Sequence, residues 1–299
     1  MLFPASQTAS SLLLSAKPPH RFSSGCTALD RLITPTYVEP RSQASAINDV
    51  AAGLGQGQIL ELLGPPGIGK TRTAMAFVLE ERFRDDGGHV LVVDAEGSLS
   101  PALLRQTAEA QIAHNGDDPE VVRQVLEGIQ YRRIDSDWLL QAFFLTLEEH
   151  LAERPEINLV VIDSLSSHIR PTTDSSTRSL LAETIRTTLS GICASGRVSV
   201  IATTQMSLKL YGLDHRPSSW SRDAEALLVP QISERWIPSD VSASRVLLYY
   251  DQDGERLARL LSAPTGTRAT DAAFTMDLLG PCDYPEPEQN EAQLATSSA

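Results

Sequence analysis

The sequence predicts an α/β fold: a mostly parallel sheet flanked by helices, with an antiparallel C-terminal edge. Three observations predict it. Short apolar runs alternate with helical patterns along most of the chain, which is typical of buried parallel strands joined by helical crossovers. A glycine-rich loop joins the first of these strands to its helix. Two strand-like runs around Asp253-Gly254 give a hairpin signal near the C-terminal end.

The elements follow from these patterns in chain order. The expected strands are Gln58–Leu63, His89–Val93, Ile129–Arg132, Asn158–Ile162 and Val198–Thr203. The expected helices are Thr71–Phe83, Ser100–His114, Asp135–Glu153 and Thr177–Ser195. The hairpin lies in RVLLYYDQDGERLARLL, and AAFTMDL after it is expected to form a further strand. The parallel sheet is therefore extended by antiparallel strands.

Composition predicts one large core with looser ends. The 299 residues are 41% apolar and 21% charged, enough to bury a single α/β core over residues 24–280. Residues 34–52 are expected to form a linker or insertion within it. Residues 1–23, which begin with a stretch rich in Ser, Ala and Pro, and the acidic tail 281–299 are expected to be disordered.

Several classes of protein are disfavoured. No apolar run approaches the ~18 residues of a membrane span, and no basic residue precedes Lys17, which argues against a signal peptide. Cys26, Cys193 and Cys282 lie far apart, which favours reduced thiols over a zinc site. The net charge of −13 argues against a strongly basic nucleic-acid binder but leaves room for a local basic groove.

The segment GPPGIGKT, residues 64–71, fits a phosphate-binding loop in a strand–loop–helix setting. Its glycines let backbone N–H groups point at the β- and γ-phosphates of a nucleotide. The expected ATP-binding residues are Gly64, Pro65, Pro66, Gly67, Ile68, Gly69, Lys70 and Thr71. Lys70 is expected to reach the β/γ-phosphates, and the Thr71 hydroxyl to bind Mg²⁺. The complete motif in this setting disfavours a chance Gly/Pro turn.

Polar residues end three other expected strands. Asp163 closes INLVVIDS, where it is expected to hold Mg²⁺, and the alternative is a helix N-cap. Asp94 and Glu96 end VLVVDAEGS; we expect Glu96 to be the catalytic base that orients the attacking water, and otherwise both residues cap the next helix. Gln205 ends VSVIATTQM, where its amide could bind the γ-phosphate and report its loss, although a polar strand end is the simpler explanation.

Together GPPGIGKT, DAEGS, LVVIDS and IATTQM resemble the RecA-type recombinase family. SGCTALDRLI, residues 24–33, looks like the short element before the phosphate loop in the eukaryotic members, and LVPQISERW with RVLLYYDQDGERLARLLSAP resembles their C-terminal section. The likeness runs from about Ser24 to Asp277. Among subgroups, the eukaryotic recombinase paralogues look closer than the main strand-exchange enzyme, and the C-type paralogue looks closest. The resemblance implies a RecA-like P-loop ATPase core that uses ATP and Mg²⁺.

The resemblance also implies roles for particular residues. Glu96 is the family's catalytic glutamate, Lys70 its catalytic lysine, and Gln205 its γ-phosphate sensor. Two DNA-facing loops fall near His168–Arg178 and Met206–Pro230. Their candidate DNA contacts are Arg170, Arg178, Lys209, Arg216 and Arg222, with Tyr211 or Trp220 available to stack on bases. For each of these residues the alternative is a solvated loop charge.

The sequence departs from the family in several places. Arg72 stands where the family usually has Gln, and Thr204 where Asn is common. The arginine that packs on adenine in many members aligns near Leu103, with Arg105 the nearest substitute. No room before Ser24 is evident for the N-terminal helical domain, nor is a Phe-x-x-Ala polymerisation motif, so long filaments are not expected.

The resemblance therefore favours a nuclear recombination mediator in homologous-recombination DNA repair after DNA damage. Such a protein binds single-stranded DNA as a hetero-oligomer with other paralogues, helps to load the main recombinase, and hydrolyses ATP slowly in a DNA-dependent manner. One alternative is another RecA-like ATP-driven motor or a small-molecule kinase, although no lid sequence for a kinase is evident. Another is a non-hydrolysing interaction module of a repair complex, against which the intact Lys70, Thr71, Glu96 and Asp163 count.

Overall fold

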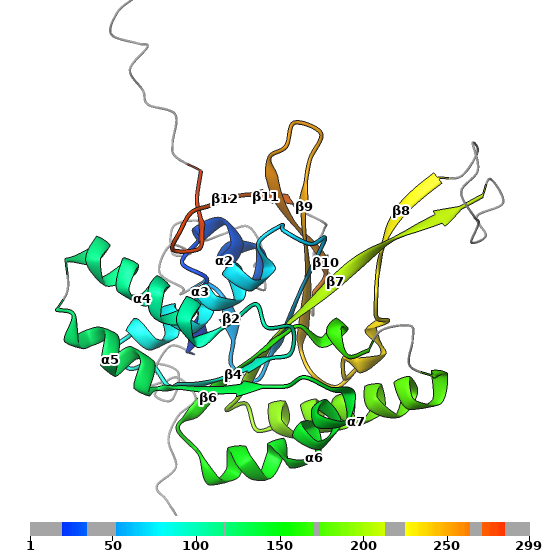
Figure 1. Ribbon diagram of the computed structural model, residues 1–299, viewed down its shortest axis with the longest axis horizontal. Helices are drawn as coiled ribbons and strands as arrows, with labels where there is room; N and C mark the ends of the chain where they lie inside the picture. Colours follow the sequence, from blue (N-terminus) through cyan, green and yellow to red (C-terminus); the bar gives the residue numbers. More distant parts are fainter. Residues whose placement is uncertain are drawn as a thin grey trace, which may run out of the picture.

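The computed structural model describes residues 20–34, 52–116, 118–169, 174–212, 225–263 and 271–284. Within these ranges, the largest sheet has nine strands, in the order β11-β10-β9-β3-β7-β6-β4-β5, with β8 paired to β7 beyond this path (Figure 1). The α/β class with a mostly parallel sheet and an antiparallel C-terminal edge is confirmed. No helix in the described ranges has the length and apolar character needed to cross a membrane.

Six strands of this sheet run parallel to one another. They are β3 (Ile59–Gly64), β4 (His89–Asp94), β5 (Ile129–Arg133), β6 (Ile157–Asp163), β7 (Ser199–Tyr211) and β9 (Ala243–Tyr250). The central strands are apolar and buried on both sides, as expected for strands covered by helices on both faces. The hairpin predicted around Asp253-Gly254 joins β9 to the antiparallel β10 (Arg256–Ser262), and β11 (Asp271–Ala273) pairs antiparallel with β10.

Helices cover the two faces of the sheet. On one face lie α3 (Lys70–Phe83), α4 (Pro101–Asn115) and α5 (Glu120–Glu127); on the other lie α6 (Asp137–Glu153) and α7 (Ser175–Ala194) (Figure 1). Each face has its own apolar core cluster. Two short 3-10 helices span Leu165–Ser167 and Glu234–Trp236. In such doubly wound sheets ligands bind beyond the carboxyl ends of the strands, which here places β3, β4, β6 and β7 around one site.

Three segments differ from the prediction. Helix α5 was not among the expected helices, although Pro119 stands directly before it and Gly128 directly after it, where these residues mark helix ends. The further strand expected over AAFTMDL is interrupted: β11 ends at Ala273, Phe274 is fully buried, and β12 (Thr275–Met276) pairs with β13 (Pro281–Cys282) as a separate hairpin. Strand β7 also extends eight residues past Thr203 and pairs with β8 (Glu225–Pro230).

The core boundaries predicted at residues 24 and 280 lie inside the fold. Before Ser24, β1 (Arg21–Phe22) pairs with β2 (Leu54–Gly55), and His20 Nε2 lies 2.9 Å from Glu81 Oε2 on α3. After residue 280, Asp283 accepts hydrogen bonds from the first amides of α2 (Thr27–Ile33). Composition could not predict these contacts, because both segments depend on partners far away in the sequence.

Asp283→Ala is expected to lower the free energy of unfolding by about 1 kcal/mol, the usual contribution of a helix N-cap. The carboxylate accepts from the backbone N of Thr27 at 3.0 Å and of Ala28 at 2.7 Å. Chemical denaturation of the variant beside Glu149→Ala, which removes an exposed carboxylate on α6, measures this difference.

The effect of Asp283 should also depend on pH. Burial alone raises the pKa of Asp283, but the hydrogen bonds from Thr27 and Ala28 outweigh burial and hold the pKa below its ordinary value. A lowered pKa means that the stabilisation is present at neutral pH and lost as the pH falls through that pKa. If the difference in free energy of unfolding between the wild type and Asp283→Ala stays constant down to low pH, Asp283 does not stabilise α2 as an ionised carboxylate.

Candidate functional site

The loop between β3 and α3 has the geometry of a phosphate cradle. Gly67 (φ +81°) and Gly69 (φ +112°) both adopt the left-handed conformation that favours glycine, and Gly69 sits at the N-cap of α3. Ile68 between them is fully buried, which fixes the loop to the core. The first turn of α3 therefore presents its free N–H groups and the positive end of its dipole to an anion.

Lys70 lies folded over this loop. Its Nζ donates to the carbonyl oxygens of Gly64, at 3.0 Å, and Pro65, at 2.9 Å. Burial lowers the pKa of Lys70, and the nearby carboxylates of Asp163 and Glu96 partly oppose that effect. The cation is thus placed at the mouth of the loop, between its carbonyls and the carboxylates beyond.

Oxygen atoms from three elements converge beside the loop. Asp163 Oδ2, at the end of β6, accepts at 2.8 Å from Thr71 Oγ1 and at 2.8 Å from Ser98 Oγ, while the two hydroxyl oxygens lie 3.4 Å apart. Asp163 Oδ1 accepts from the Thr203 hydroxyl. Carboxylate and hydroxyl oxygens suit Mg²⁺, which prefers hard ligands and keeps several waters. Thr71 and Asp163 meet as predicted, and the donor set fits the metal.

Two details of this cluster go beyond the sequence prediction. Ser98 was not among the predicted site residues, although it is the last letter of the DAEGS motif. Asp163 does not cap a helix, because Ser164 stands at the N-cap of the following 3-10 helix and Asp174 at that of α7. The N-cap alternative for Asp163 is therefore wrong.

Asp94 and Glu96 have different surroundings. Asp94 is buried, and its Oδ1 accepts from the backbone N of Glu96 (3.2 Å) and of Gly97 (2.5 Å). Its Oδ2 accepts from the Tyr131 hydroxyl at 2.8 Å, and burial together with this bond raises the pKa of Tyr131 to about 12. Asp94 thus holds the loop that carries Glu96, whose side chain stays accessible.

The capping alternative for this pair is also wrong, because the N-cap of α4 is Ser100. The Ser100 hydroxyl oxygen accepts from the backbone N of Leu103 at 3.3 Å. Glu96 instead interacts across the site, where Gln205 Nε2 donates to its Oε1.

Gln205 lies at the same sheet edge as the phosphate loop. It pairs in register with Gly64 of β3, and its backbone N donates to Ser166 Oγ at 2.7 Å. The preceding Thr204 turns to the other side of β7, where its hydroxyl donates to Glu61 Oε1 at 2.8 Å. Lys70, Glu96 and Gln205, predicted from three separate motifs, therefore surround one space beyond the carboxyl ends of the strands.

A model of one protein family, described as AAA domain, matches residues 39–207, which is more than half of the chain. The chain belongs to the AAA domain family. The matched region includes the phosphate loop, Glu96, Asp163 and Gln205, so the geometry above is that of an ATP-binding P-loop ATPase related to the RecA type. A search of curated proteins finds no match.

The second predicted DNA-facing segment, Met206–Pro230, forms a strand at each of its ends. Met206 pairs with Pro230 and Tyr211 with Glu225, so β7 and β8 form a two-stranded ribbon that projects beyond the body of the molecule (Figure 1). Leu208, Leu227 and Leu228 are exposed on this ribbon. Lys209 lies exposed on β7.

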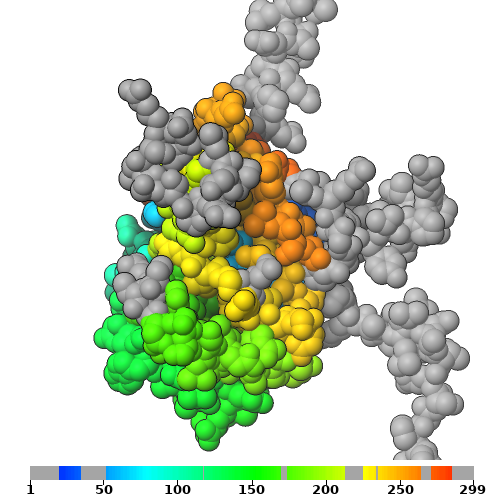
Figure 2. All heavy atoms as spheres, turned by 90° about the vertical axis from the view of Figure 1, so that its right-hand side faces the viewer, coloured from blue at the N-terminus to red at the C-terminus, as the bar shows by residue number. Residues whose placement is uncertain are grey.

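The remaining DNA candidates of the chain divide into two groups. Arg170, Arg216 and Arg222, together with Trp220, lie outside the described residues. Arg178, in the first turn of α7, lines a cavity of about 320 Å³ with Gln231, Arg235 and Trp236, which follow β8. This is the side of the molecule shown in Figure 2, where β8 appears in yellow. Arg235 was not predicted as a DNA contact, although it lies within the LVPQISERW stretch.

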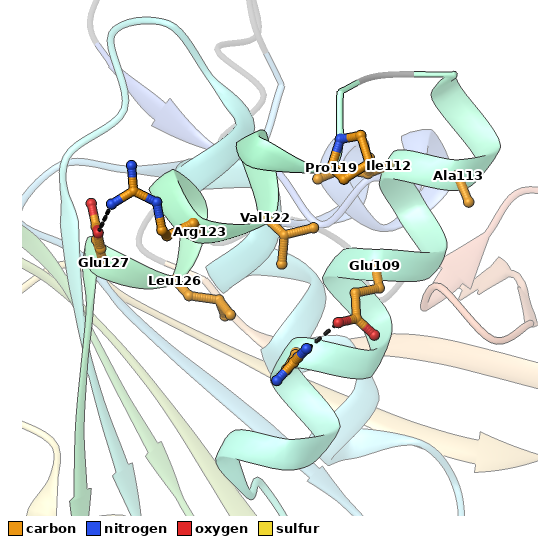
Figure 3. A pocket seen from close by; sticks show the side chains of 9 residues that line it. Glu109, Ile112, Ala113, Pro119, Val122, Arg123, Leu126 and Glu127 are labelled. Atoms are coloured by element: carbon orange, nitrogen blue, oxygen red, sulfur yellow. Dashed lines mark hydrogen bonds and ion pairs between the residues drawn. The ribbon is translucent and has the colours of Figure 1, made fainter.

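Arg105, the nearest substitute for the adenine-packing arginine, has another partner in the AAA domain. It lies 2.7 Å from Glu109 and lines a cavity of about 800 Å³ between α4 and α5, beside Ile112, Val122 and Leu126 (Figure 3). The residues that line this cavity belong to α4, α5 and Pro119 just before α5. Arg105 therefore faces a groove that is separate from the phosphate loop.

Proposed function

We propose that this protein is a recombination mediator of homologous-recombination DNA repair in the nucleus. It binds single-stranded DNA together with recombinase paralogues, as a hetero-oligomer, and helps to load the main recombinase while hydrolysing ATP slowly in response to DNA. The observation that carries the proposal is the continuity of β7, which contains Gln205 at the nucleotide site and continues directly into the exposed ribbon.

Each catalytic residue has a distinct task in this proposal. Lys70 and the loop amides bind the β- and γ-phosphates, and Glu96 accepts a proton from the water that attacks the γ-phosphate. Asp94 keeps Glu96 in place through the backbone of residues 96 and 97. Thr71 and Asp163 would hold Mg²⁺, which would supply positive charge that neutralises the phosphate oxygens.

Gln205 couples the two ends of β7. Its amide donates to Glu96 in the structure, and a γ-phosphate oxygen offers a second acceptor in the same space. A change of partner moves the side chain at the point where β7 leaves the sheet, and the ribbon follows as an ordered segment. ATP turnover and the position of the ribbon are thereby linked.

The proposed binding of DNA is supported by cationic side chains at the base of the ribbon and on the ribbon itself. Arg178 and Arg235 share one cavity, and Gln231 in the same cavity donates its backbone N to Gln205 O at 2.9 Å. Lys209 extends this basic area along β7. A few phosphate contacts on a chain with a net charge of −13 give weak affinity at physiological salt. Several such surfaces aligned by paralogue partners hold one strand tightly through effective concentration.

Replacing both arginines, Arg178→Ala with Arg235→Ala, is expected to weaken single-stranded DNA binding and to flatten its salt dependence. Each lost phosphate contact reduces the slope of log K against log salt by about 0.7. Fluorescence anisotropy over a salt series, with ATP and with the co-purified partners, measures both quantities. Arg123→Ala is the matched control, because Arg123 is paired with Glu120 and Glu127 on the remote α5.

Two results would overturn the DNA proposal. One is an unchanged slope in the double variant; the other is DNA affinity of the partnered protein that does not respond to ATP. Purification from DNA-damaged cells tests the assembly, and recovery without any recombinase or paralogue would contradict the mediator role. In that case the site would still be that of an ATPase, but one whose function does not involve DNA.

A further inference from the structure

The guanidinium group of Arg133 lies against the loop that carries Glu96. Arg133 is the last residue of β5, and its Nη1 donates to the carbonyl oxygen of Asp94, at 2.8 Å, and to that of Ile134, at 3.3 Å. Gly97 lies on another side of the same group, because a Cβ atom added to Gly97 would be 3.3 Å from Arg133 Nη2. One planar group therefore contacts the loop both before and after Glu96.

Arg133 also supplies positive charge to the buried Asp94. The Asp94 side chain is 1% exposed, and burying a carboxylate is costly unless the carboxylate is paired and hydrogen-bonded. Arg133 Nη1 lies 3.5 Å from Asp94 Oδ1, and the same oxygen accepts from the backbone N of Glu96 and of Gly97. The cation therefore stabilises the carboxylate on which these two amides depend.

The loop around Glu96 is held from two neighbouring strands. On the β6 side, the backbone N of Ala95 donates to Asp163 O at 2.7 Å, and the backbone N of Glu96 donates to the same oxygen at 3.2 Å. On the β5 side, Arg133 holds it. Gly97 has φ +90°, in the left-handed region, so the chain turns directly after Glu96. The direction of the Glu96 side chain thus depends on the groups that hold this turn.

Arg133 lies at the margin of the fold rather than in its core. Strand β5 is the last strand in the order of the sheet, and the Arg133 side chain is 43% exposed. Its removal leaves no cavity in either core cluster, because water can fill the space. Its contact with the loop matters more for the reaction, since a misplacement of about 1 Å in a reacting group can cost about 10²-fold in rate.

We propose that Arg133 is a positioning residue for ATP hydrolysis, which acts through Asp94 and Gly97 to direct the Glu96 carboxylate at the attacking water. The proposal rests on the role of Glu96 as general base in the proposed function and is independent of the binding of DNA. Arg133 touches neither the phosphate loop nor Lys70. The substitution of Arg133 therefore changes the rate of hydrolysis and leaves the binding of ATP to the phosphate loop.

Two measurements separate positioning from binding: phosphate release under single-turnover conditions, and the Kd of a fluorescent ATP analogue. Arg133→Ala is expected to slow phosphate release about 10- to 100-fold and to leave the Kd unchanged. Arg133→Lys keeps a cation and a donor for the Asp94 carbonyl, although it loses the planar group, and is expected to regain part of the rate. Arg132→Ala is the matched control, because Arg132 is the preceding exposed residue of β5 and its Nη2 lies 3.4 Å from His150 Nδ1 on α6.

A double variant tests the route through Glu96. If Arg133 acts through Glu96, Arg133→Ala causes no further loss of rate in the Glu96→Gln background, because the base is already absent. Losses that multiply would overturn the proposal. A wild-type rate in Arg133→Ala, or a Kd that rises in step with the loss of rate, would overturn it as well.

Arg133→Lys decides the question if Arg133→Ala does not fold. Slower phosphate release at an unchanged Kd in the lysine variant would support the positioning role, and a wild-type rate would contradict it. A wild-type rate in Glu96→Gln alone would instead refute the base in the proposed function. That outcome distinguishes the failure of the proposed function from the failure of the role of Arg133.

Discussion

Glu96→Gln is expected to bind ATP as tightly as the wild type while its turnover falls about 10²–10⁴-fold, the usual cost of removing a general base. Glutamine has nearly the same shape and still offers an oxygen to the amide of Gln205, so the site keeps its structure. It cannot take the proton from the attacking water. Phosphate release under single-turnover conditions, together with binding of a fluorescent ATP analogue, separates the two effects.

Asp94→Asn is the informative comparison for this variant. Asp94 accepts from two backbone amides and from the Tyr131 hydroxyl, and Arg133 Nη1 lies 3.5 Å from its Oδ1. Its replacement should lower the free energy of unfolding as well as turnover, whereas Glu96→Gln should leave stability intact. Normal turnover in Glu96→Gln would remove Glu96 from the role of base.

Lys70→Ala is expected to raise the Kd of ATP about 10- to 100-fold, which corresponds to the loss of hydrogen bonds to a charged group. The substitution removes the cation that faces the β- and γ-phosphates. It also removes the two bonds by which Nζ closes the loop on Gly64 and Pro65. Titration of a fluorescent ATP analogue measures the change.

Lys209→Ala serves as the control, because it removes the same side chain from an exposed position on the ribbon. Its ATP affinity should equal that of the wild type. Wild-type affinity in Lys70→Ala would be incompatible with nucleotide binding at the phosphate loop.

The sequence could locate the edge at which the nucleotide site forms. Parallel strands bring their carboxyl ends to one side of a sheet, so Glu96, Asp163 and Gln205 could be grouped with the phosphate loop from pattern alone. The sequence could not assign the structural role of Asp94. Asp94 and Glu96 are two carboxylates only two residues apart, and their roles differ through their surroundings in the fold. Ser98 was hidden for a related reason: a serine after a glycine is common, and only its approach to Asp163 makes it part of the site.

The elements that were missed depend on distant partners. The short α5 is stabilised by packing on α3, where Arg82 Nε donates to Val125 O at 3.3 Å. The β12–β13 hairpin has two-residue strands that carry no periodicity, and it is fixed by Arg72 and by the turn at Asp277. The ribbon was taken for a DNA-facing loop on the resemblance, although Met206, Leu208 and Leu210 alternate with Ser207 and Lys209 as in a strand.

The continuity of β7 has a mechanical consequence. Tyr211 lies six positions after Gln205 on β7, and a strand rises ~3.3 Å per residue, so the described end of the ribbon lies roughly 20 Å from Gln205. A tilt of only about 3° at Gln205 displaces that end by about 1 Å at this lever length. In the proposed coupling, β7 would act as a lever pivoting at Gln205, so that the exchange of one hydrogen bond there would displace the far end of the ribbon.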